Sequence, residues 1–211
     1  MSGELDKAFW EERYHGHTGH RHGRQPNPQL VAEAGDLAPG TALDAGCGEG
    51  TDAIWLASRG WRVTAVDFVG TALRRARERT ESVDGDIASR IDWLEADLTG
   101  WTPMEEHFDL VSSQYVHLPA APRAAMFRRL AAAVAPGGTL LFVGHHPSDL
   151  ETTISRGEAP DLYLTAEEAA ADLDPDRWDI AVAEARPRPE ADPHGHEITV
   201  RDAVLRARKR P

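Results

Sequence analysis

Alternating glycines follow an acidic residue at the end of a short apolar segment. Asp44 closes residues 41–44 and is followed by Gly46, Gly48 and Gly50. Glycines at alternate positions allow a tight turn and let a ligand approach the backbone closely. Where such a turn opens a helix, its free N–H groups and the helix dipole face a ligand anion. The pattern predicts a ligand-binding loop between a strand and a helix.

Two residues of this loop help to identify the ligand. The dinucleotide fingerprint G-x-G-x-x-G would need a glycine where Thr51 stands. The carboxylate of Asp44 would repel a pyrophosphate but suits an ammonium or sulfonium charge. S-adenosylmethionine carries both charges, and its carboxylate can bind the loop N–H groups. We therefore expect this cofactor, with S-adenosylhomocysteine as product, rather than a nicotinamide dinucleotide.

Two further acids end the next predicted strands. Asp67 follows residues 63–66 at a separation from the loop that suits hydrogen bonds to both ribose hydroxyls. Phe68 is expected to lie on the adenine face. Asp97, next to Leu98, is expected to accept a hydrogen bond from the adenine amino group. The alternative is that these aspartates cap the following helices, and it is strongest for Asp97.

Strand and helix signals alternate from about residue 40 onward, which predicts a parallel, doubly wound sheet with helices on both faces. Residues 179–183 and 199–207 also resemble strands. A proline-rich connector, residues 186–193, separates them, so they should pair antiparallel. The other predicted elements are strands 41–44, 61–66, 91–94, 108–112 and 139–143, and helices 52–58, 71–80 and 123–134.

These elements predict an α/β protein with a Rossmann-like, seven-stranded, mostly parallel sheet and a C-terminal antiparallel strand. Residues 1–40, with helical signals at 5–14 and 28–37, are expected to form an N-terminal helical lid. Residues 41–211 are expected to form the core domain.

Together the motifs resemble those of the class I S-adenosylmethionine-dependent methyltransferases, over roughly residues 41–143. The resemblance implies that the three glycines and Asp44 form the cofactor loop, that Asp67 binds the ribose, and that Asp97 contacts adenine. It also implies that Gln114 borders the methionine end of the cofactor. The segment Pro136-Gly-Gly matches the family's turn into its fifth strand.

Two N-terminal segments narrow the resemblance. Residues 9–14 and 26–30 look like the subgroup that contains thiopurine-type and tellurite-resistance-type methyltransferases, which act on small molecules. In that subgroup Trp10 and Tyr14 would match aromatic residues that close over the cofactor. Residues 15–24 depart from the pattern.

The acceptor should bind outside the carboxyl ends of the strands, where Tyr115, His117, His145 and His146 are candidates. Methyl transfer from a sulfonium is an in-line displacement that depends on alignment and exclusion of water. A base is needed only when the nucleophile must lose a proton. We select His117 and His146, because imidazole can accept a proton from a phenol, acid or thiol. The alternative is that they are hydrogen-bonded loop histidines or helix caps.

The cluster His15, His17, His20 and His22 has no cysteine or acidic residues at ligand spacing, so we predict no metal. A lid that faces the substrate and a solvated loop both remain open for this segment.

Charge and composition limit the partners. The 211 residues carry a formal net charge of −12, which disfavours nucleic acid and anionic membranes. A single cysteine, no signal-peptide pattern and no run of about 18 apolar residues favour a cytoplasmic protein. We expect a small-molecule acceptor and a monomer or weak homodimer. The alternative function is a non-catalytic, or non-methylating, S-adenosylmethionine-binding protein of the same fold.

Overall fold

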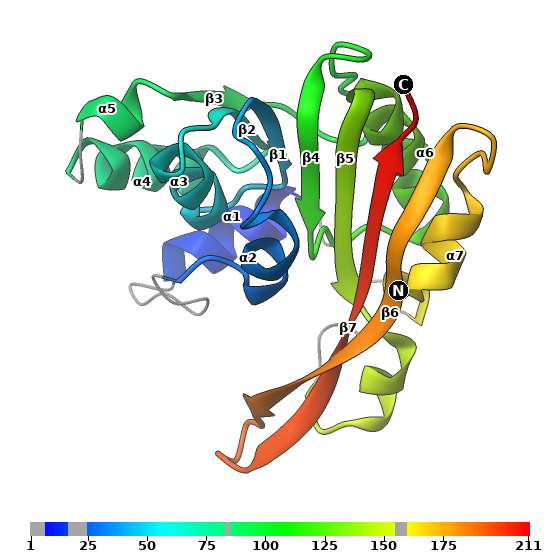
Figure 1. The fold of residues 1–211 in the computed structure, drawn as a ribbon. Helices are drawn as coiled ribbons and strands as arrows, with labels where there is room; N and C mark the ends of the chain where they lie inside the picture. Colours follow the sequence, from blue (N-terminus) through cyan, green and yellow to red (C-terminus); the bar gives the residue numbers. More distant parts are fainter. Residues whose placement is uncertain (1–6, 17–24, 83–84, 155–159) are drawn as a thin grey trace.

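A single mixed sheet organises the computed structural model, which describes residues 7–16, 25–82, 85–154 and 160–211 (Figure 1). The strand order is β3-β2-β1-β4-β5-β7-β6, and β7 runs in the opposite direction to the other six strands. The predicted seven-stranded sheet and its antiparallel C-terminal strand are confirmed. The strands are β1 (Thr41–Ala45), β2 (Arg62–Asp67), β3 (Ile91–Glu95), β4 (Phe108–Gln114), β5 (Val134–His145), β6 (Trp178–Ala191) and β7 (Glu197–Lys209).

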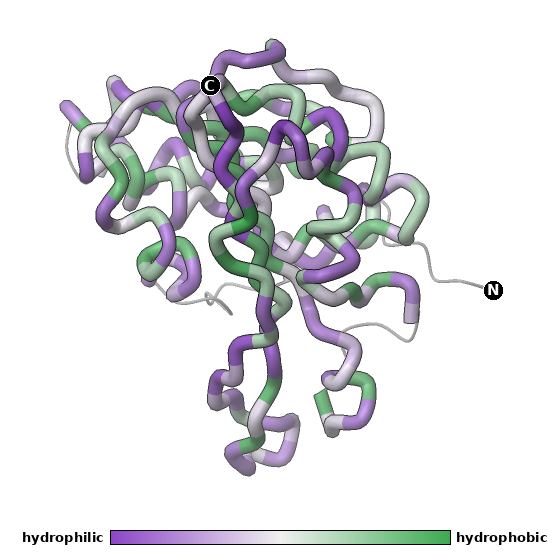
Figure 2. Tube along the Cα trace, turned by 45° about the vertical axis from the view of Figure 1, so that its right-hand side comes forward, coloured by the Kyte–Doolittle hydropathy of each residue, from purple (hydrophilic) through white to green (hydrophobic). Residues whose placement is uncertain are grey.

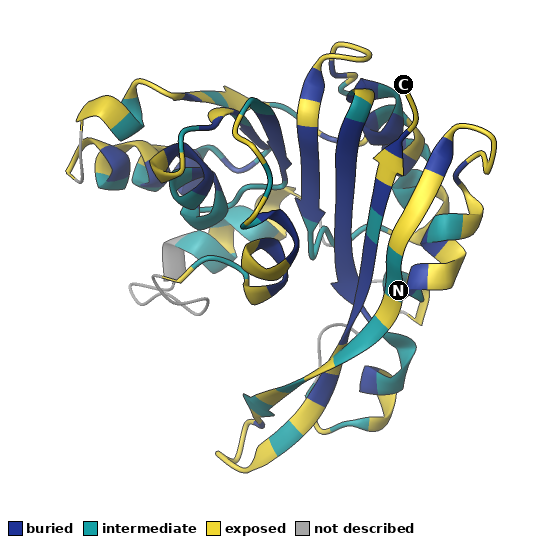
Figure 3. Cartoon of the chain, in the orientation of Figure 1, coloured by how far each residue is buried: buried dark blue, intermediate teal, exposed yellow. Residues whose placement is uncertain are grey.

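Helices cover both faces of the sheet, and each face has its own apolar core. Leu30 of α2 and Leu56 of α3 are buried on one face, and Phe127 of α6 lies in the core of the other. The helices are α1 (Lys7–Gly16), α2 (Pro28–Ala34), α3 (Thr51–Ser58), α4 (Gly70–Glu81), α5 (Gly85–Ala88), α6 (Ala120–Ala133) and α7 (Ala166–Ala171), with short 3-10 helices η1 (Pro147–Glu151) and η2 (Pro160–Leu162). Figure 3 shows that the central strands are the most buried part of the chain.

The boundary between α6 and β5 differs from the prediction. The helix expected over 123–134 ends at Ala133, and the strand begins directly at Val134. The Pro136-Gly-Gly segment is therefore part of β5 rather than a separate turn, and Val134 pairs with Phe108 before a register shift. Between Phe108 and Leu110 β4 advances by two residues while β5 advances by five, from Val134 to Thr139, so this irregularity absorbs three extra residues without ending the strand.

The proline-rich segment expected to be a connector is instead part of β6. The prediction was wrong because β6 is the edge strand, where a residue without an N–H group breaks no ladder hydrogen bond. Pro187 and Pro189 pair with Arg201 and Thr199 of β7. Since they are two residues apart, their nitrogens point to the same side of the strand, and proline is tolerated there when that side is the unpaired edge. The predicted antiparallel pairing is confirmed.

The long β6–β7 hairpin extends past the rest of the sheet. Strand β5 ends at His145, which pairs with Asp202, so the hairpin end (residues 187–201) projects beyond it. This hairpin end projects past the carboxyl ends of the parallel strands, and α1 and α2 lie near the same end of the sheet (Figure 1). Figure 2 shows that hydrophobic residues follow the central strands and that the hairpin end is mainly hydrophilic.

In the part of the chain that the structure describes, no helix combines the length and apolar character needed to cross a membrane.

The edge prolines generate a prediction. Replacing Pro187 and Pro189 with threonine should increase self-association, because it adds two N–H groups to an unpaired strand edge. Light scattering over a concentration series, compared with the wild type, would measure this. Pro193→Thr, in the turn between β6 and β7, is the control. Unchanged scattering of the double variant would contradict the role assigned to the prolines.

Candidate active site

The strand order reverses between β1 and β4, and the region outside the carboxyl ends of these two strands is called the crevice below. In open α/β sheets, ligands bind at this topological switch point, outside the carboxyl ends of the strands. The glycine loop lies here, with positive φ angles of 84° at Gly46, 52° at Gly48 and 74° at Gly50. Its first turn is held by hydrogen bonds of 2.8 and 3.0 Å from the Gly46 and Cys47 amides to the Val66 carbonyl.

Close packing explains why glycine is needed in this loop. A Cβ on Gly46 would lie 2.6 Å from Val116 Cγ2, and one on Gly48 would lie 2.9 Å from the Tyr14 hydroxyl oxygen. Leu98 is buried beside the loop, 3.9 Å from the Gly46 Cβ position. Any larger residue would therefore meet both steric contact and an unfavourable φ.

Two buried acceptor atoms in the crevice have no hydrogen-bond partner among the described residues: Asp44 Oδ2 and Gln114 Oε1. Asp44 pairs in register with Ser112, and Gln114 lies two residues further along β4, so both side chains leave the same face of the sheet. Burial raises the pKa of Asp44 well above its usual range, and the nearby carboxylates of Asp52 and Asp67 raise it further. A ligand that donates hydrogen bonds and carries positive charge would satisfy both atoms.

The second strand-end acid, Asp67, ties the glycine loop to β2. Its Oδ2 accepts the Gly48 amide at 2.8 Å, and its Oδ1 accepts the Val69 amide at 2.9 Å. Burial raises its pKa, whereas these amides act in the opposite direction. A carboxylate has about four acceptor positions, so capacity remains for ribose hydroxyls. Phe68, the next residue, is half-buried.

Helix α1 lies across the glycine loop and the start of α4 (Figure 1). Thr71 of α4 donates a 2.7 Å hydrogen bond to Glu11, and Lys7 binds Glu95 at 2.6 Å. The Tyr14 phenol reaches Gly48, and burial, followed by the negative charge of Asp67, raises its pKa. The phenol therefore stays neutral and forms one wall of the loop.

Aromatic and imidazole rings meet on the acceptor side of the crevice. The His117 ring lies 5.4 Å from that of Trp10 and 5.2 Å from that of His145. His145 in turn stacks on Tyr115, with centroids 4.7 Å apart, and lies 6.3 Å from Tyr163. The structure thus brings the predicted His117 and Trp10 together with His145.

His146 does not belong to this ring cluster. Its contacts are those of a helix cap, which was the alternative to a catalytic role. Its Nδ1 accepts the Ser148 amide at 3.2 Å and caps η1. Successive residues of an extended chain point to opposite sides, so only one of His145 and His146 can face the cluster. The predicted catalytic role of His146 therefore gains no support from these contacts, whereas His145 joins the cluster. The burial of the end of β5 was the missing information.

Asp97 is exposed, and one of its oxygens caps the turn that follows, which is close to the capping role considered as the alternative. Oδ1 accepts the Thr99 amide at 2.8 Å and the Thr99 hydroxyl at 2.7 Å. Contact with adenine remains a prediction for the rest of this carboxylate.

The histidine cluster of the N-terminal region is not seen as a unit, because His17, His20 and His22 lie outside the described residues. Within the described ranges there is no group of three or more His, Cys, Asp or Glu side chains that could hold a metal.

Asp52, in the first turn of α3, was not singled out from the sequence. Its Oδ1 accepts the Asn27 amide at 2.7 Å, which joins the residues before α2 to the cofactor loop. Burial raises its pKa to about 6, and it adds to the negative charge around Asp44.

This raised pKa predicts a pH-dependent effect of Asp52→Asn on stability. The folded state favours protonated Asp52, so the stabilisation is present below pH 4 and is lost as the pH rises through 6. Asparagine keeps the acceptor without the charge, so the variant should be more stable by about 2 kcal/mol at pH 8 and unchanged near pH 4. Chemical unfolding at both pH values measures this. Exposed Asp92→Asn is the control, and an equal effect of Asp52→Asn at both pH values would contradict the prediction.

Comparison with known proteins shows a similarity to methyltransferases over part of the chain. Residues 42–138 match the model of a methyltransferase domain. The trans-aconitate 2-methyltransferase of Rhizobium meliloti is 32% identical over 119 residues, which cover 55% of this chain and 42% of that protein. The chain spans about half the length of the curated relatives it matches.

Solved structures agree over nearly the whole chain. One, from work on the conversion of a disulfide bond into a thioacetal group during echinomycin biosynthesis, has a TM-score of 0.75 at 22% identity, covering 97% of this chain and 92% of that one. The N-methyltransferase NodS of Bradyrhizobium japonicum, in complex with S-adenosylhomocysteine, has a TM-score of 0.62 at 20% identity, covering 97% and 89%. The sequence match over residues 42–138 is thus to a methyltransferase domain, and the solved structures share the fold of the chain.

Proposed function

We propose that this protein binds S-adenosylmethionine in the crevice between β1 and β4 and transfers its methyl group to a small molecule. The observation that carries the proposal is the pair of buried acceptor atoms, Asp44 Oδ2 and Gln114 Oε1, beside the glycine loop. An ammonium group would supply the missing donors and offset the negative charge of the three neighbouring carboxylates.

The other residues extend this site along the cofactor. The loop around Gly46, Gly48 and Gly50 would bind the cofactor carboxylate through backbone N–H groups. Asp67 would accept from the ribose hydroxyls. Phe68, Leu98 and Asp97 would border the adenine.

When bound, S-adenosylmethionine supplies an electrophilic methyl group on a sulfonium. The protein's contribution is to align the acceptor and exclude water. Trp10 and Tyr14 on α1 would cover the site, with residues 1–40 as a lid over a core of residues 41–211; the contact of the Tyr14 hydroxyl with the Gly48 position supports this. His117 would accept a proton from the acceptor.

A small acceptor is supported by two observations. Tyr14 of α1, the described part of the proposed lid, lies against the glycine loop, and the net charge of −12 disfavours nucleic acid. The relative named for trans-aconitate also has a small acceptor. Small acids, phenols, thiols and amines are therefore the compounds to test.

The cofactor assignment predicts that Asp67→Asn weakens S-adenosylhomocysteine binding by about ten- to a hundredfold, because the amide disturbs the loop contact and removes a charged acceptor. Isothermal titration calorimetry measures the affinity, and exposed Asp92→Asn is the control. Wild-type affinity of the Asp67 variant would show that the cofactor site is wrongly assigned.

The base assignment predicts a loss that depends on the acceptor. In a panel of phenols, thiols, amines and carboxylic acids, His117→Gln should reduce turnover about a hundredfold for acceptors that must lose a proton. An already ionised carboxylate should be methylated at the wild-type rate.

His146→Gln is the matched control, since its imidazole caps η1. Equal losses in both variants would contradict the assignment of His117. Tight S-adenosylhomocysteine binding without turnover of any acceptor would favour the alternative of a non-catalytic binding protein.

A further inference from the structure

Arg123, in the first turn of α6, donates three hydrogen bonds to main-chain carbonyl groups. Its Nη1 donates to Leu118 at 3.1 Å and to Asp161 at 2.6 Å, and its Nη2 donates to Tyr163 at 3.2 Å. Because α6 begins at Ala120, this cation lies at the positive end of the helix dipole, where positive charge is unfavourable. The three contacts, rather than the stability of the helix, therefore explain an arginine at this position.

The three carbonyl groups belong to two segments that are far apart in the sequence, and each segment carries a ring of the acceptor side. Leu118 directly follows His117 in the loop after β4, and Tyr163 directly follows η2. The rings of His117 and Tyr163 both lie near that of His145, at centroid distances of 5.2 and 6.3 Å. Since a guanidinium is planar and rigid, Arg123 sets the separation of the two segments that carry these rings.

The segment that carries Tyr163 also packs on the end of β5. The Leu164 amide donates to the His145 carbonyl at 3.1 Å. A Cβ on Gly144 would lie 2.5 Å from Leu164 Cδ2, so glycine at this position lets the segment approach the strand closely. Tyr163 and Leu164 are both buried. Residues 160–164, called the acceptor wall below, are therefore held against the end of β5.

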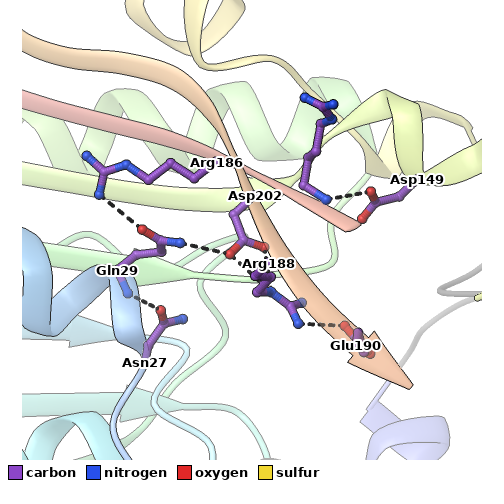
Figure 4. Close-up of polar contacts among 8 residues, drawn as sticks. Asn27, Gln29, Asp149, Arg186, Arg188, Glu190 and Asp202 are labelled. Atoms are coloured by element: carbon purple, nitrogen blue, oxygen red, sulfur yellow. Dashed lines mark hydrogen bonds and ion pairs between the residues drawn. The ribbon is translucent and has the colours of Figure 1, made fainter. Parts of the chain in front are cut away.

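The connection between β5 and α7, residues 146–165, has a separate anchor near its start. Asp149 of η1 accepts the Arg201 amide of β7 through Oδ1 at 2.8 Å. Figure 4 shows Asp149 at this contact, near the buried Asp202 of the same strand, which is bound to Arg188. The start of the connection is thus held by β7, and its later part is tied to α6.

We propose that Arg123 is a positioning residue of the acceptor site, which holds the acceptor wall at a fixed place relative to His117 and so determines where the acceptor can lie. This proposal rests on the proposed function, because it takes His117 as the group that accepts the acceptor's proton. Arg123 itself acts through the carbonyl groups that it binds.

The test uses Arg123→Met and Arg123→Lys. Methionine removes all three donors and keeps an unbranched apolar side chain. Lysine keeps the charge but lacks the planar fork that spans both segments, so it tests the proposal even if Arg123→Met folds poorly. Arg129→Met is the matched control, because Arg129 lies on the same helix and also donates three hydrogen bonds to main-chain carbonyl groups, those of Leu98, Thr99 and Trp101. It should lower stability to a similar degree without moving the acceptor wall.

Three readouts apply: the ring-proton NMR shifts of Tyr163 and His145 in the protein without ligands, the affinity for S-adenosylhomocysteine, and kcat/KM for the phenol, thiol, amine or carboxylic acid that the wild type methylates fastest. Arg123→Met should change both sets of ring shifts and lower kcat/KM about tenfold or more, because the acceptor is no longer aligned. Arg123→Lys should have smaller effects in the same direction. The affinity of both variants for S-adenosylhomocysteine should stay at the wild-type value, since the contacts of Arg123 do not involve the glycine loop or Asp67.

Wild-type ring shifts in both Arg123 variants would overturn the proposal, and so would changed ring shifts with an unchanged kcat/KM. Equal changes of the ring shifts in Arg129→Met, or a matching loss of affinity for S-adenosylhomocysteine in the Arg123 variants, would also overturn it, because they would show a general loss of structure. Failure of the proposed function is a different result: the wild type would then bind no S-adenosylhomocysteine or methylate no acceptor, whatever the ring shifts of the variants show.

Discussion

Burial of negative charge at the carboxyl ends of the strands is the constraint on which the rest of this structure depends. Asp44, Asp52 and Asp67 are all withdrawn from water, and burial raises the pKa of each. Most of their oxygens are occupied by backbone amides of the loops that they shape. Carboxylates kept in such a place cost free energy in the absence of a cation. The buried carboxylates and the unpartnered Asp44 Oδ2 beside them therefore support the proposal of a positively charged ligand.

The cofactor half of the site could be predicted from the sequence because its signals are local. Spacing alone places Gly46, Gly48 and Gly50 after Asp44, and strand periodicity places Asp67 at the end of β2. Each of these positions depends on residues within one strand–loop–helix unit. The alternation of such units also predicts the parallel sheet. Boundaries were less certain, as the early end of α6 shows, because helix and strand signals overlap around Val134.

The acceptor half could not be predicted in this way because it is assembled from distant segments. In the sequence Asp202 follows Arg201 in a strand with several other charged residues, so nothing marks it as buried, and only the antiparallel pairing brings it next to His145. The choice between His145 and His146 depends on which side of β5 is buried. The proline-rich segment reads as a connector, although Arg188 within it is the partner that the buried carboxylate requires.

This division also follows the bounds of the match to known methyltransferases. The matched region, residues 42–138, contains the glycine loop and Asp67 but ends before His145 and the hairpin. Trp10 and Tyr14 of α1 also lie outside it. Under the proposed function, the matched region would hold the cofactor, whereas the groups around the acceptor would come from segments on both sides of it. These segments meet at Asp202, which accepts hydrogen bonds from Gln29 and Arg188. A change in either segment would therefore alter the proposed acceptor side and leave the residues proposed to bind the methyl donor in place.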